Sequence, residues 1–297
     1  MPLMRTLCLG EVLVDLVCEH AVDSSSQADA FVPRFGGDVA NAAVTAARLG
    51  ADVALAGGAG NDAWGAWVRD RLAAEGVALD WFALLDGVST PIAFVTVDSQ
   101  GEPAFMFYGE HFAAGAHPHD GVAACDALFF TSNSLLDEQE RMLAFTTRRQ
   151  ALDEGKPVVV DANLRPGRWD ATDTAVSVVR GCVPHAALLK CNRVEARLLT
   201  GREDPAAAAD ALLGLGAQSV VVTLGADGAL LRGAGGELDV PGVPAKPVDT
   251  TGAGDAVSGV LLARLTAGGF DPSVLADALP EAVAAAARVT EQFGAIA

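Results

Sequence analysis

The segment Pro157-Val158-Val159-Val160-Asp161 decides the fold, and Ser219-Val220-Val221-Val222-Thr223 repeats its pattern. Three consecutive valines with no polar alternation are typical of a strand that is buried on both faces, as in a parallel sheet. Segments with helical spacing lie before and after these strands. The alternation of strands and helices predicts an α/β protein with an open, doubly wound, mostly parallel sheet that is flanked by helices.

The same alternation extends along most of the chain. Strands are predicted at residues 6–9, 52–56, 127–130, 157–160, 187–190 and 219–224. One helix is predicted to begin after Asp62, a residue suited to a helix N-cap, and to end at Gly76. Further helices are predicted at residues 38–49, 138–154, 172–183, 193–200 and 206–215.

Two segments interrupt this alternation, at about residues 11–35 and 81–110. They show alternating apolar and polar positions with turn residues and no helical period, and residues 90–98 followed by Gln100-Gly101 are typical of a hairpin. No linker-like or low-complexity segment separates them from the rest of the chain. We therefore expect a single domain over residues 1–297 with a small β-sheet lid inserted into it, over a site at the sheet edge.

The composition excludes several classes of function. Lys and Arg number 20 against 38 Asp and Glu, and a net charge of −18 without any basic run excludes nucleic acid as a partner. No apolar stretch approaches the ~20 residues of a membrane span, and the N-terminus lacks the pattern of a secretory signal. The five cysteines form no Cys-x-x-Cys pair, as expected of reduced thiols. We expect a soluble, cytoplasmic protein with no membrane partner.

Polar residues recur where the predicted strands end. In an open α/β sheet, ligands bind at the carboxyl ends of the strands, so these residues are the first candidates for a site. The recurrence at several neighbouring strands predicts a polar ligand. The residues concerned are Glu11, Asp15, Asp161, Asn163, Arg165, Lys190, Asn192, Thr223 and Gly225.

The segment Asp249-Thr250-Thr251-Gly252-Ala253-Gly254-Asp255 precedes an apolar helix. Small residues before a helix leave backbone N–H groups accessible, and the helix dipole adds partial positive charge, so the segment is typical of an anion site. Asp255 could simply cap the helix. A carboxylate beside a phosphate also suits a base that deprotonates an attacking hydroxyl. P-loop, Gly-x-Ser-x-Gly and His-Glu-x-x-His motifs are absent from the sequence, which excludes their chemistry.

Along nearly its whole length, the sequence resembles the ribokinase/PfkB family of carbohydrate kinases. The resemblance implies a ribokinase-like fold, ATP-dependent transfer of the γ-phosphate to a primary hydroxyl of a carbohydrate, and a β lid over the sugar. It rests on five motifs in the family's order: Gly36-Gly37-Asp38-Val39-Ala40-Asn41, Asp161-x-Asn163-x-Arg165, Asn192-x-x-Glu195, Thr223-Leu224-Gly225-x-x-Gly228 and residues 249–255.

The resemblance also implies catalytic and acceptor-binding residues. Asp255 matches the catalytic base of the family. The N–H groups of Gly252, Ala253 and Gly254 match the anion hole beside it. Positions that bind sugar hydroxyls are matched by Asp15, Gly36, Gly37 and Asn41, and Arg165 is a further substrate-binding candidate.

ATP, Mg²⁺ and a monovalent cation are implied in the same way. Thr223, Gly225 and Gly228 match the nucleotide loop. Asn192 and Glu195 match the motif that holds the magnesium–phosphate assembly, through water molecules that magnesium tends to keep. A monovalent-cation site found in part of the family, for which K⁺ is the expected ion, is matched by Asp249, Thr251 and a carbonyl of Gly294.

The acceptor is inferred from a departure from the family pattern. Residues 161–166 with Trp169 resemble the fructokinase and 2-keto-3-deoxygluconate kinase branches, and Gly37-Asp38 leans towards the second. Both branches usually carry an arginine after the aromatic pair that matches Phe107-Tyr108, but here Gly109 stands there, next to Glu110. A sugar acid needs a cationic partner for its carboxylate, which leaves Arg165 as the main candidate.

The sequence therefore favours a neutral ketose, fructose first. The alternatives are a 2-keto-3-deoxygluconate kinase and, less favoured, a nucleoside kinase. A sugar-binding regulator without turnover is disfavoured because the motifs around Asp255 are intact. Apolar residues of the lid strands, Phe94, Phe105 and Phe107, could pair with a second copy of the chain to form a homodimer.

Overall fold

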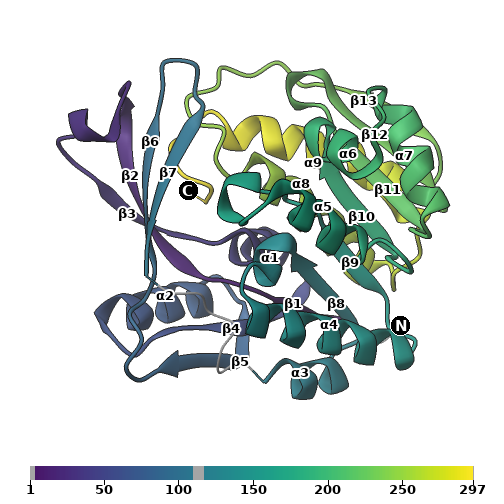
Figure 1. Cartoon of the computed structure of the whole chain (residues 1–297), viewed down its shortest axis with the longest axis horizontal. Coiled ribbons are helices and arrows are strands. Elements are labelled where there is room, and N and C mark those ends of the chain that lie inside the picture. Colours follow the sequence, from purple (N-terminus) through teal and green to yellow (C-terminus); the bar gives the residue numbers. More distant parts are fainter. Residues whose placement is uncertain (1–3, 110–116, 297) are drawn as a thin grey trace.

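The computed structural model describes residues 4–109 and 117–296. Its main layer is a nine-stranded sheet in the order β13-β12-β11-β10-β9-β8-β1-β4-β5 (Figure 1). Strands from β11 to β5 run parallel to their neighbours, and β12 and β13 extend the sheet as an antiparallel edge. The bounds are β1 (Arg5–Leu9), β4 (Asp52–Gly60), β5 (Ala78–Leu85), β8 (Ala127–Thr131), β9 (Val158–Asp161), β10 (Leu188–Asn192), β11 (Ser219–Thr223), β12 (Gly228–Gly233) and β13 (Leu238–Pro241).

Helices cover both faces of this large sheet, which confirms the predicted architecture (Figure 1). One face packs against α3 (Pro118–Ala124), α4 (Glu138–Asp153), α5 (Thr172–Arg180), α6 (Arg193–Thr200) and α7 (Pro205–Gly214). The other face packs against α1 (Asp38–Arg48), α2 (Ala63–Ala74), α8 (Ala253–Ala267) and α9 (Val274–Val289). Among the described residues, no helix is both long and apolar enough to cross a membrane.

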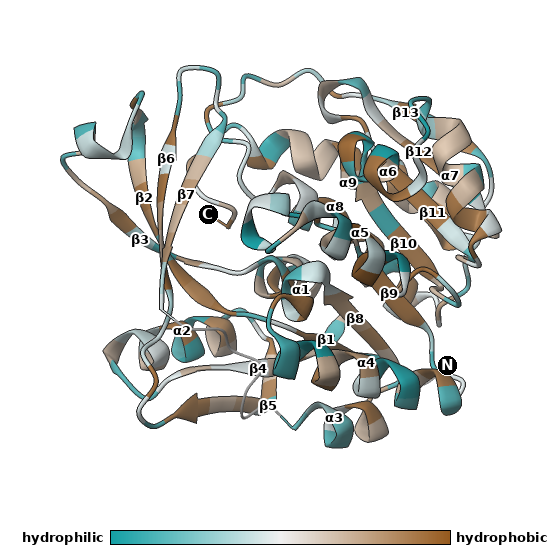
Figure 2. Ribbon diagram, viewed as in Figure 1, coloured by the Kyte–Doolittle hydropathy of each residue, from teal (hydrophilic) through white to brown (hydrophobic). Residues whose placement is uncertain are grey.

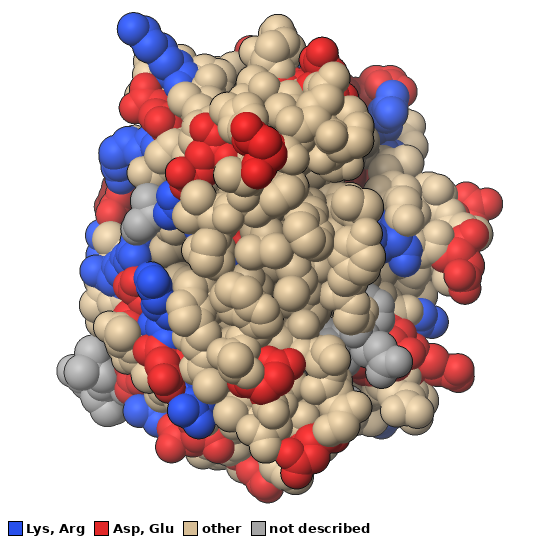
Figure 3. Space-filling view, turned by 90° about the vertical axis from the view of Figure 1, so that its left-hand side faces the viewer, with Lys and Arg blue, Asp and Glu red and all other residues tan. Residues whose placement is uncertain are grey.

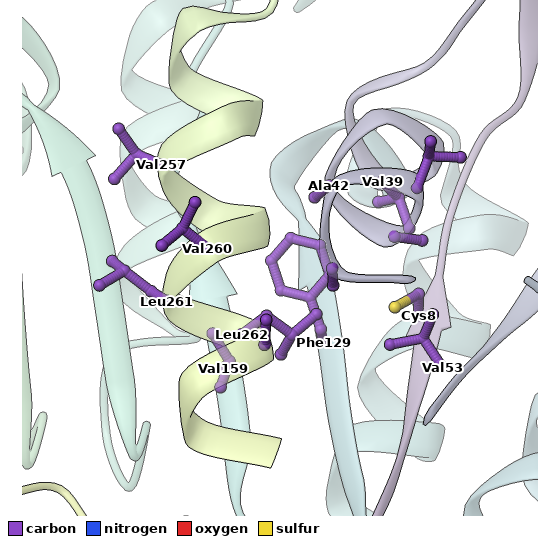
Figure 4. Close-up of a cluster of buried hydrophobic side chains, with 14 of the residues drawn as sticks. Cys8, Val39, Ala42, Val53, Phe129, Val159, Val257, Val260, Leu261 and Leu262 are labelled. Carbon is purple, nitrogen blue, oxygen red and sulfur yellow. The ribbon is translucent and has the colours of Figure 1, made fainter. Parts of the chain in front are cut away.

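The valine runs explain why two layers of helices are needed. In β9, Val158 and Val160 belong to the hydrophobic core on one face of the sheet, and Val159 belongs to the core on the other face. Figure 4 shows the second of these cores, where Val159 and Phe129 lie near Leu262 of α8. Each strand therefore buries apolar surface away from water on both sides. This burial is the main favourable term in folding.

A smaller sheet stands beside the large one, in the strand order β3-β2-β6-β7 (Figure 1). Its strands are β2 (Leu13–Ala21), β3 (Val32–Gly36), β6 (Ile92–Val97) and β7 (Pro103–Tyr108). The sequence predicts the second lid segment from residue 81, but residues 78–85 form β5 and pair with β4 in the large sheet. The cause is that Trp81 and Phe82 pack into the cores on opposite faces of that sheet, so both positions are apolar contacts.

Candidate functional site

A pocket of about 530 Å³ lies between the smaller sheet and the carboxyl edge of the large sheet. The smaller sheet contributes Leu13, Asp15, Phe105 and Phe107 to its lining. The rest comes from segments that follow β1, β3, β8 and β9, including Glu11, Gly37, Asp38, Asn41, Asn133, Arg165 and Arg168. Of the predicted polar strand ends, those after β1 and β9 therefore meet at this pocket, with the smaller sheet opposite them. The residues predicted at the ends of β10 and β11 do not line it, namely Lys190, Asn192, Thr223 and Gly225.

Asp255 lies in the first turn of α8 and is 7% exposed. Gly252 precedes that turn in the left-handed region, at φ +78°, where glycine is favoured. The side-chain amide of Asn41 donates a hydrogen bond of 2.8 Å to Oδ2 of Asp255, which joins the starts of α1 and α8. Burial and the nearby Asp38 carboxylate raise the pKa of Asp255 to about 8, against the effect of the Asn41 hydrogen bond. A buried carboxylate with a pKa near neutrality is suited to accept a proton.

The segment for which an anion hole is predicted forms a turn at the start of α8, and one of its N–H groups already has a partner. The N–H of Ala253 donates to the carbonyl of Thr250 at 3.3 Å. Gly252 packs closely on the C-terminal segment, because an added Cβ would lie 2.3 Å from Cβ of Ala295. At Gly254, an added Cβ would lie 3.0 Å from Nζ of Lys190. Packing therefore requires glycine at position 252, whereas a side chain at position 254 would be in tight contact with the Lys190 ammonium.

Asp15 and Gly37 line the same pocket, and Gly36 lies directly against Asp15. An added Cβ on Gly36 would lie 2.2 Å from Oδ2 of Asp15, and Gly37 has φ +107° directly before α1. Burial raises the pKa of Asp15 well above its ordinary value, and Asp38 and Asp255 raise it further. The two glycines thus let β3 and the start of α1 pass close to a buried carboxyl group.

Two arginines project into the pocket from the loop after β9. The guanidinium of Arg165 lies 6.0 Å from the ring centre of Phe105, and that of Arg168 lies 4.5 Å from the ring centre of Phe107. Nη1 of Arg168 is 3.3 Å from a carboxylate oxygen of Glu11 and donates to Oδ1 of Asn133 at 3.2 Å. Both arginines therefore contact the smaller sheet, and Arg168 also pairs with an acidic residue.

Sequence reasoning missed Arg168 as a site residue. The sequence Arg165-Pro166-Gly167-Arg168 carries a signal for it, because Pro-Gly predicts a turn. Residues 166–168 form a 3-10 turn, in which positions three apart lie on the same side. Three acidic residues line the pocket together with the two arginines, and they are Glu11, Asp15 and Asp38. The side-chain amide of Asn133 donates to the Asp38 carboxylate, and burial raises the pKa of Asp38 to about 6 although Arg165 lowers it.

Asn192 and Glu195 form a capping box at the start of α6. Oδ1 of Asn192 accepts from the N–H of Glu195 at 2.9 Å, and Oε2 of Glu195 accepts from the N–H of Asn192 at 2.7 Å. Oε1 of Glu195 also accepts from the N–H of Leu164 at 2.8 Å. The Asn-x-x-Glu spacing therefore has a structural explanation, which fixes the carboxylate beside the loop after β9.

The remaining predicted residues fall into two groups. Thr223 pairs with Asn192 across β10 and β11, and Gly225 and Gly228 follow with φ of +64° and +102°. Asp249 is fully buried, and its two oxygens accept from the N–H groups of Thr251 and Gly294, each at 2.8 Å. The N–H of Gly294 thus contacts Asp249. The carbonyl of Gly294, which the family resemblance implies as a ligand of the monovalent cation, stays a prediction.

Candidate metal ligands are dispersed in the part of the chain that the structure describes. Among the residues that the structure describes, no cluster of three or more His, Cys, Asp or Glu is arranged to hold a metal ion. The Thr251 hydroxyl oxygen is buried without a hydrogen-bond partner within the described part of the chain.

A second groove of about 610 Å³ lies at the β12–β13 edge, where Arg193 pairs with Asp227 and Arg232 with Asp239.

The chain was compared with known proteins. Residues 5–297 match the model of the pfkB family of carbohydrate kinases. Aminoimidazole riboside kinase of Salmonella typhimurium is 31% identical over 97% of this chain and 89% of its own length. Fructokinase-1 of Oryza sativa is 32% identical over 90% of this chain and 84% of its own length. A double-mutant fructokinase of Vibrio cholerae O395, solved with fructose, ADP and potassium, has a TM-score of 0.85 at 29% identity, over 99% of this chain and 94% of that one.

Fold, site and comparisons define an enzyme that transfers a phosphoryl group to an alcohol. The chain belongs to the pfkB family of carbohydrate kinases. The identities to fructokinases and to the riboside kinase are equal within one percentage point, so they do not choose between sugar acceptors.

Proposed function

We propose that this kinase phosphorylates a primary hydroxyl of a neutral ketose, fructose first, with ATP as the donor. The observation that carries the proposal is the charge balance of the pocket. Its lining holds the two guanidinium groups of Arg165 and Arg168 together with three acidic residues, Glu11, Asp15 and Asp38. A neutral polyol can hydrogen-bond to both kinds of group. An acceptor with a carboxylate would compete with these acidic residues for the guanidinium groups, since Arg168 pairs with Glu11 and Asp38 attracts Arg165.

In this proposal the reaction centre is Asp255. Asn41 orients its carboxylate, the acceptor hydroxyl gives its proton to that carboxylate, and the hydroxyl oxygen forms a bond to the γ-phosphorus while the bond to the ADP oxygen breaks. The helix start at residues 252–254 supports the anionic transferred group. The N–H of Ala253 would first have to leave Thr250. Asp15, Gly36, Gly37 and Asn41 are the proposed contacts of the acceptor.

The nucleotide is proposed to lie over Thr223, Gly225 and Gly228, at the carboxyl end of β11. Bound with ATP, Mg²⁺ would supply positive charge to the phosphate oxygens. Asn192 and Glu195 fit it through water, since each carboxylate oxygen of Glu195 uses one lone pair on a backbone N–H and keeps another. A monovalent cation such as K⁺ fits Asp249 and Thr251, where a buried carboxylate contacts only N–H donors in the described residues and a hydroxyl has no partner.

A riboside acceptor is the second candidate. Phe105 and Phe107 line the pocket with their rings stacked, 5.8 Å apart and inclined by 11°, and a planar heterocycle could pack on them. The two candidates are separated by an ATP-consumption screen over sugars, sugar acids and nucleosides. Fructose should give the highest kcat/KM. A higher value for aminoimidazole riboside would replace the fructose proposal.

The pKa of Asp255 predicts the pH dependence. Below about pH 8 the carboxyl group is increasingly protonated and cannot accept the hydroxyl proton, so kcat/KM should fall as the pH is lowered. Above that value the carboxylate is ionised and the rate should level off. The measurement is kcat/KM for the acceptor at saturating ATP, from about pH 6 to about pH 9. A profile that is flat down to about pH 6 would contradict the assignment.

The smaller sheet is also proposed to form a homodimer, through a face that differs from the predicted one. The register of β6 and β7 pairs Phe94 with Met106, so these two side chains share the outer face of the smaller sheet with Tyr108. Phe105 and Phe107 face the pocket on the other side. Figure 3 shows this side of the molecule, where an area without charged side chains is ringed by charged ones. Met106 and Tyr108 are 42% and 54% exposed. Exposed apolar patches of this kind mark interfaces.

The dimer proposal is tested by molar mass in light scattering. The wild-type chain should have twice the mass of one copy, and Tyr108→Glu should shift it to one copy. Met142→Glu is the matched control, because Met142 on α4 is 65% exposed and lies away from the smaller sheet. A wild-type chain that stays monomeric would rule the proposal out.

A further inference from the structure

A buried lysine lies beneath the first turn of α8. Lys190 on β10 is 6% exposed, and its ammonium nitrogen is 2.8 Å from Oδ2 of Asp161 on the neighbouring strand β9. The same nitrogen touches α8, since an added Cβ on Gly254 would lie 3.0 Å from it. A full positive charge is therefore enclosed between the sheet edge and the start of the helix that carries Asp255.

The ion pair is fastened to that helix. Ser258, one turn after Asp255, donates from its hydroxyl to Oδ2 of Asp161 at 2.7 Å, and the N–H of Asn163 donates to Oδ1 at 3.2 Å. Asp161 is 1% exposed. Burying two charges costs desolvation free energy that their attraction roughly offsets, so such a pair is weak evidence for stability. Its position beside the reaction centre suggests a second reason for it.

Acidic groups face this ammonium from several elements. Burial lowers the pKa of Lys190, but the carboxylates of Asp161, Glu195 and Asp255 outweigh burial and leave it raised, so the group is charged. Conversely, Lys190 is one of the groups that lower the pKa of Asp255. The charged groups that act on Asp255 come from α1, β2, β9, the loop after β9 and β10, and they are Asp38, Asp15, Asp161, Arg165 and Lys190.

We propose that Lys190 is a positioning residue for phosphoryl transfer, a fixed positive charge that supports the negative charge on Asp255 and on the group held at the first turn of α8. Lys190 acts through Asp255 and the backbone of Gly254, and it does not touch the acceptor. The inference rests on the proposed role of Asp255 as base. It is independent of which sugar is the acceptor. It also gives a reason for glycine at position 254, where a side chain would displace the ammonium.

The test removes the charge and keeps the hydrogen bond. Lys190→Gln can still donate to Asp161 through its amide. We expect kcat to fall roughly 10- to 100-fold, with KM for ATP changed by less than about threefold. Without the positive charge Asp255 is harder to ionise, so the acid limb of kcat/KM should move up by about one pH unit. Lys190→Arg should return the limb to the wild-type position.

Lys156→Gln is the matched control. Lys156 precedes β9 at the opposite end of the sheet, and its ammonium pairs with Glu154 at 2.7 Å. Its loss should leave kcat and the pH profile unchanged. Thermal unfolding of each variant identifies misfolding. If Lys190→Gln does not fold, Lys190→Met removes the charge together with the hydrogen bond, and it is then compared with Lys190→Arg, which keeps both. A variant without the charge that keeps more than about a third of the wild-type kcat, or an acid limb that does not move, would overturn the proposal.

The choice of acceptor is checked separately. The wild-type enzyme is assayed with fructose first. If another compound of the panel is phosphorylated and fructose is not, the acceptor proposal fails, and the Lys190 comparison is made with that compound and the same criteria.

Discussion

Replacing Asp255 by asparagine should abolish turnover while leaving the affinities for ATP and acceptor within a few-fold of wild type. The amide has nearly the same shape and can still contact Asn41, but it cannot accept the hydroxyl proton. General-base catalysis contributes on the order of 10²- to 10⁴-fold, and kcat should fall by that factor. The measurements are kcat by coupled ADP release and the two dissociation constants by calorimetry.

Asp277→Asn is the control for this substitution. Asp277 lies in the first turn of the neighbouring helix α9 and is exposed. It should keep wild-type kcat. If Asp255→Asn retains more than about a tenth of wild-type kcat, Asp255 is not the base, and Asp15 becomes the next candidate among the carboxyl groups of the pocket.

Fructose should be a better acceptor than 2-keto-3-deoxygluconate by roughly 10- to 150-fold in kcat/KM. One charge-assisted hydrogen bond is worth ~1.5–3 kcal/mol, and in this pocket the acid would compete with acidic residues for both cations, since Arg168 pairs with Glu11 and Asp38 attracts Arg165. An arginine at position 109 would strain the backbone, because Gly109 has φ +101° and an added Cβ would lie 2.9 Å from Cα of Pro91. Glu110, which the sequence places next to it, lies outside the described residues.

The measurement compares both acceptors under identical ATP and magnesium concentrations. Equal or better use of the acid would contradict the proposed preference. In that case Arg168→Gln and Arg165→Gln would show which guanidinium group binds the carboxylate, by a rise in KM for the acid alone. Arg168 would then have left Glu11, its partner at 3.3 Å in this structure.

The centre of the fold could be predicted because its physics is local. Valine runs give buried strands, Asp62 caps α2 by accepting from the N–H of Gly65, and residues 193–200 form the predicted helix. The strands at the two edges of the large sheet were harder to predict. In β5 and in the antiparallel β12–β13 pair, the strand pattern depends on which neighbour covers each face. Helix α3 is not among the helices that the sequence predicts, since its seven residues carry little periodicity.

The site was predictable only in part. Polar strand ends and the sheet rule brought Asp161, Lys190 and Asn192 to one edge. The contact between Asn41 and Asp255 joins residues 214 positions apart. The family resemblance assigned both residues to the site but predicted no contact between them. The pairing of Lys190 with Asp161, and that of Arg168 with Glu11, depends on side-chain geometry that spacing does not encode.

The passage from β3 into α1 has a mechanical consequence. β3 ends at Gly36 and α1 begins at Asp38, so a single residue connects the smaller sheet to the helix that holds Asp255 through Asn41. A tilt of the smaller sheet would therefore shift the start of α1 and, with it, Asn41. Water competes with the acceptor for the γ-phosphate in any kinase. We expect such a tilt to misalign the proposed base Asp255, so hydrolysis of ATP without a bound acceptor should be slow while the sheet is tilted away from the pocket.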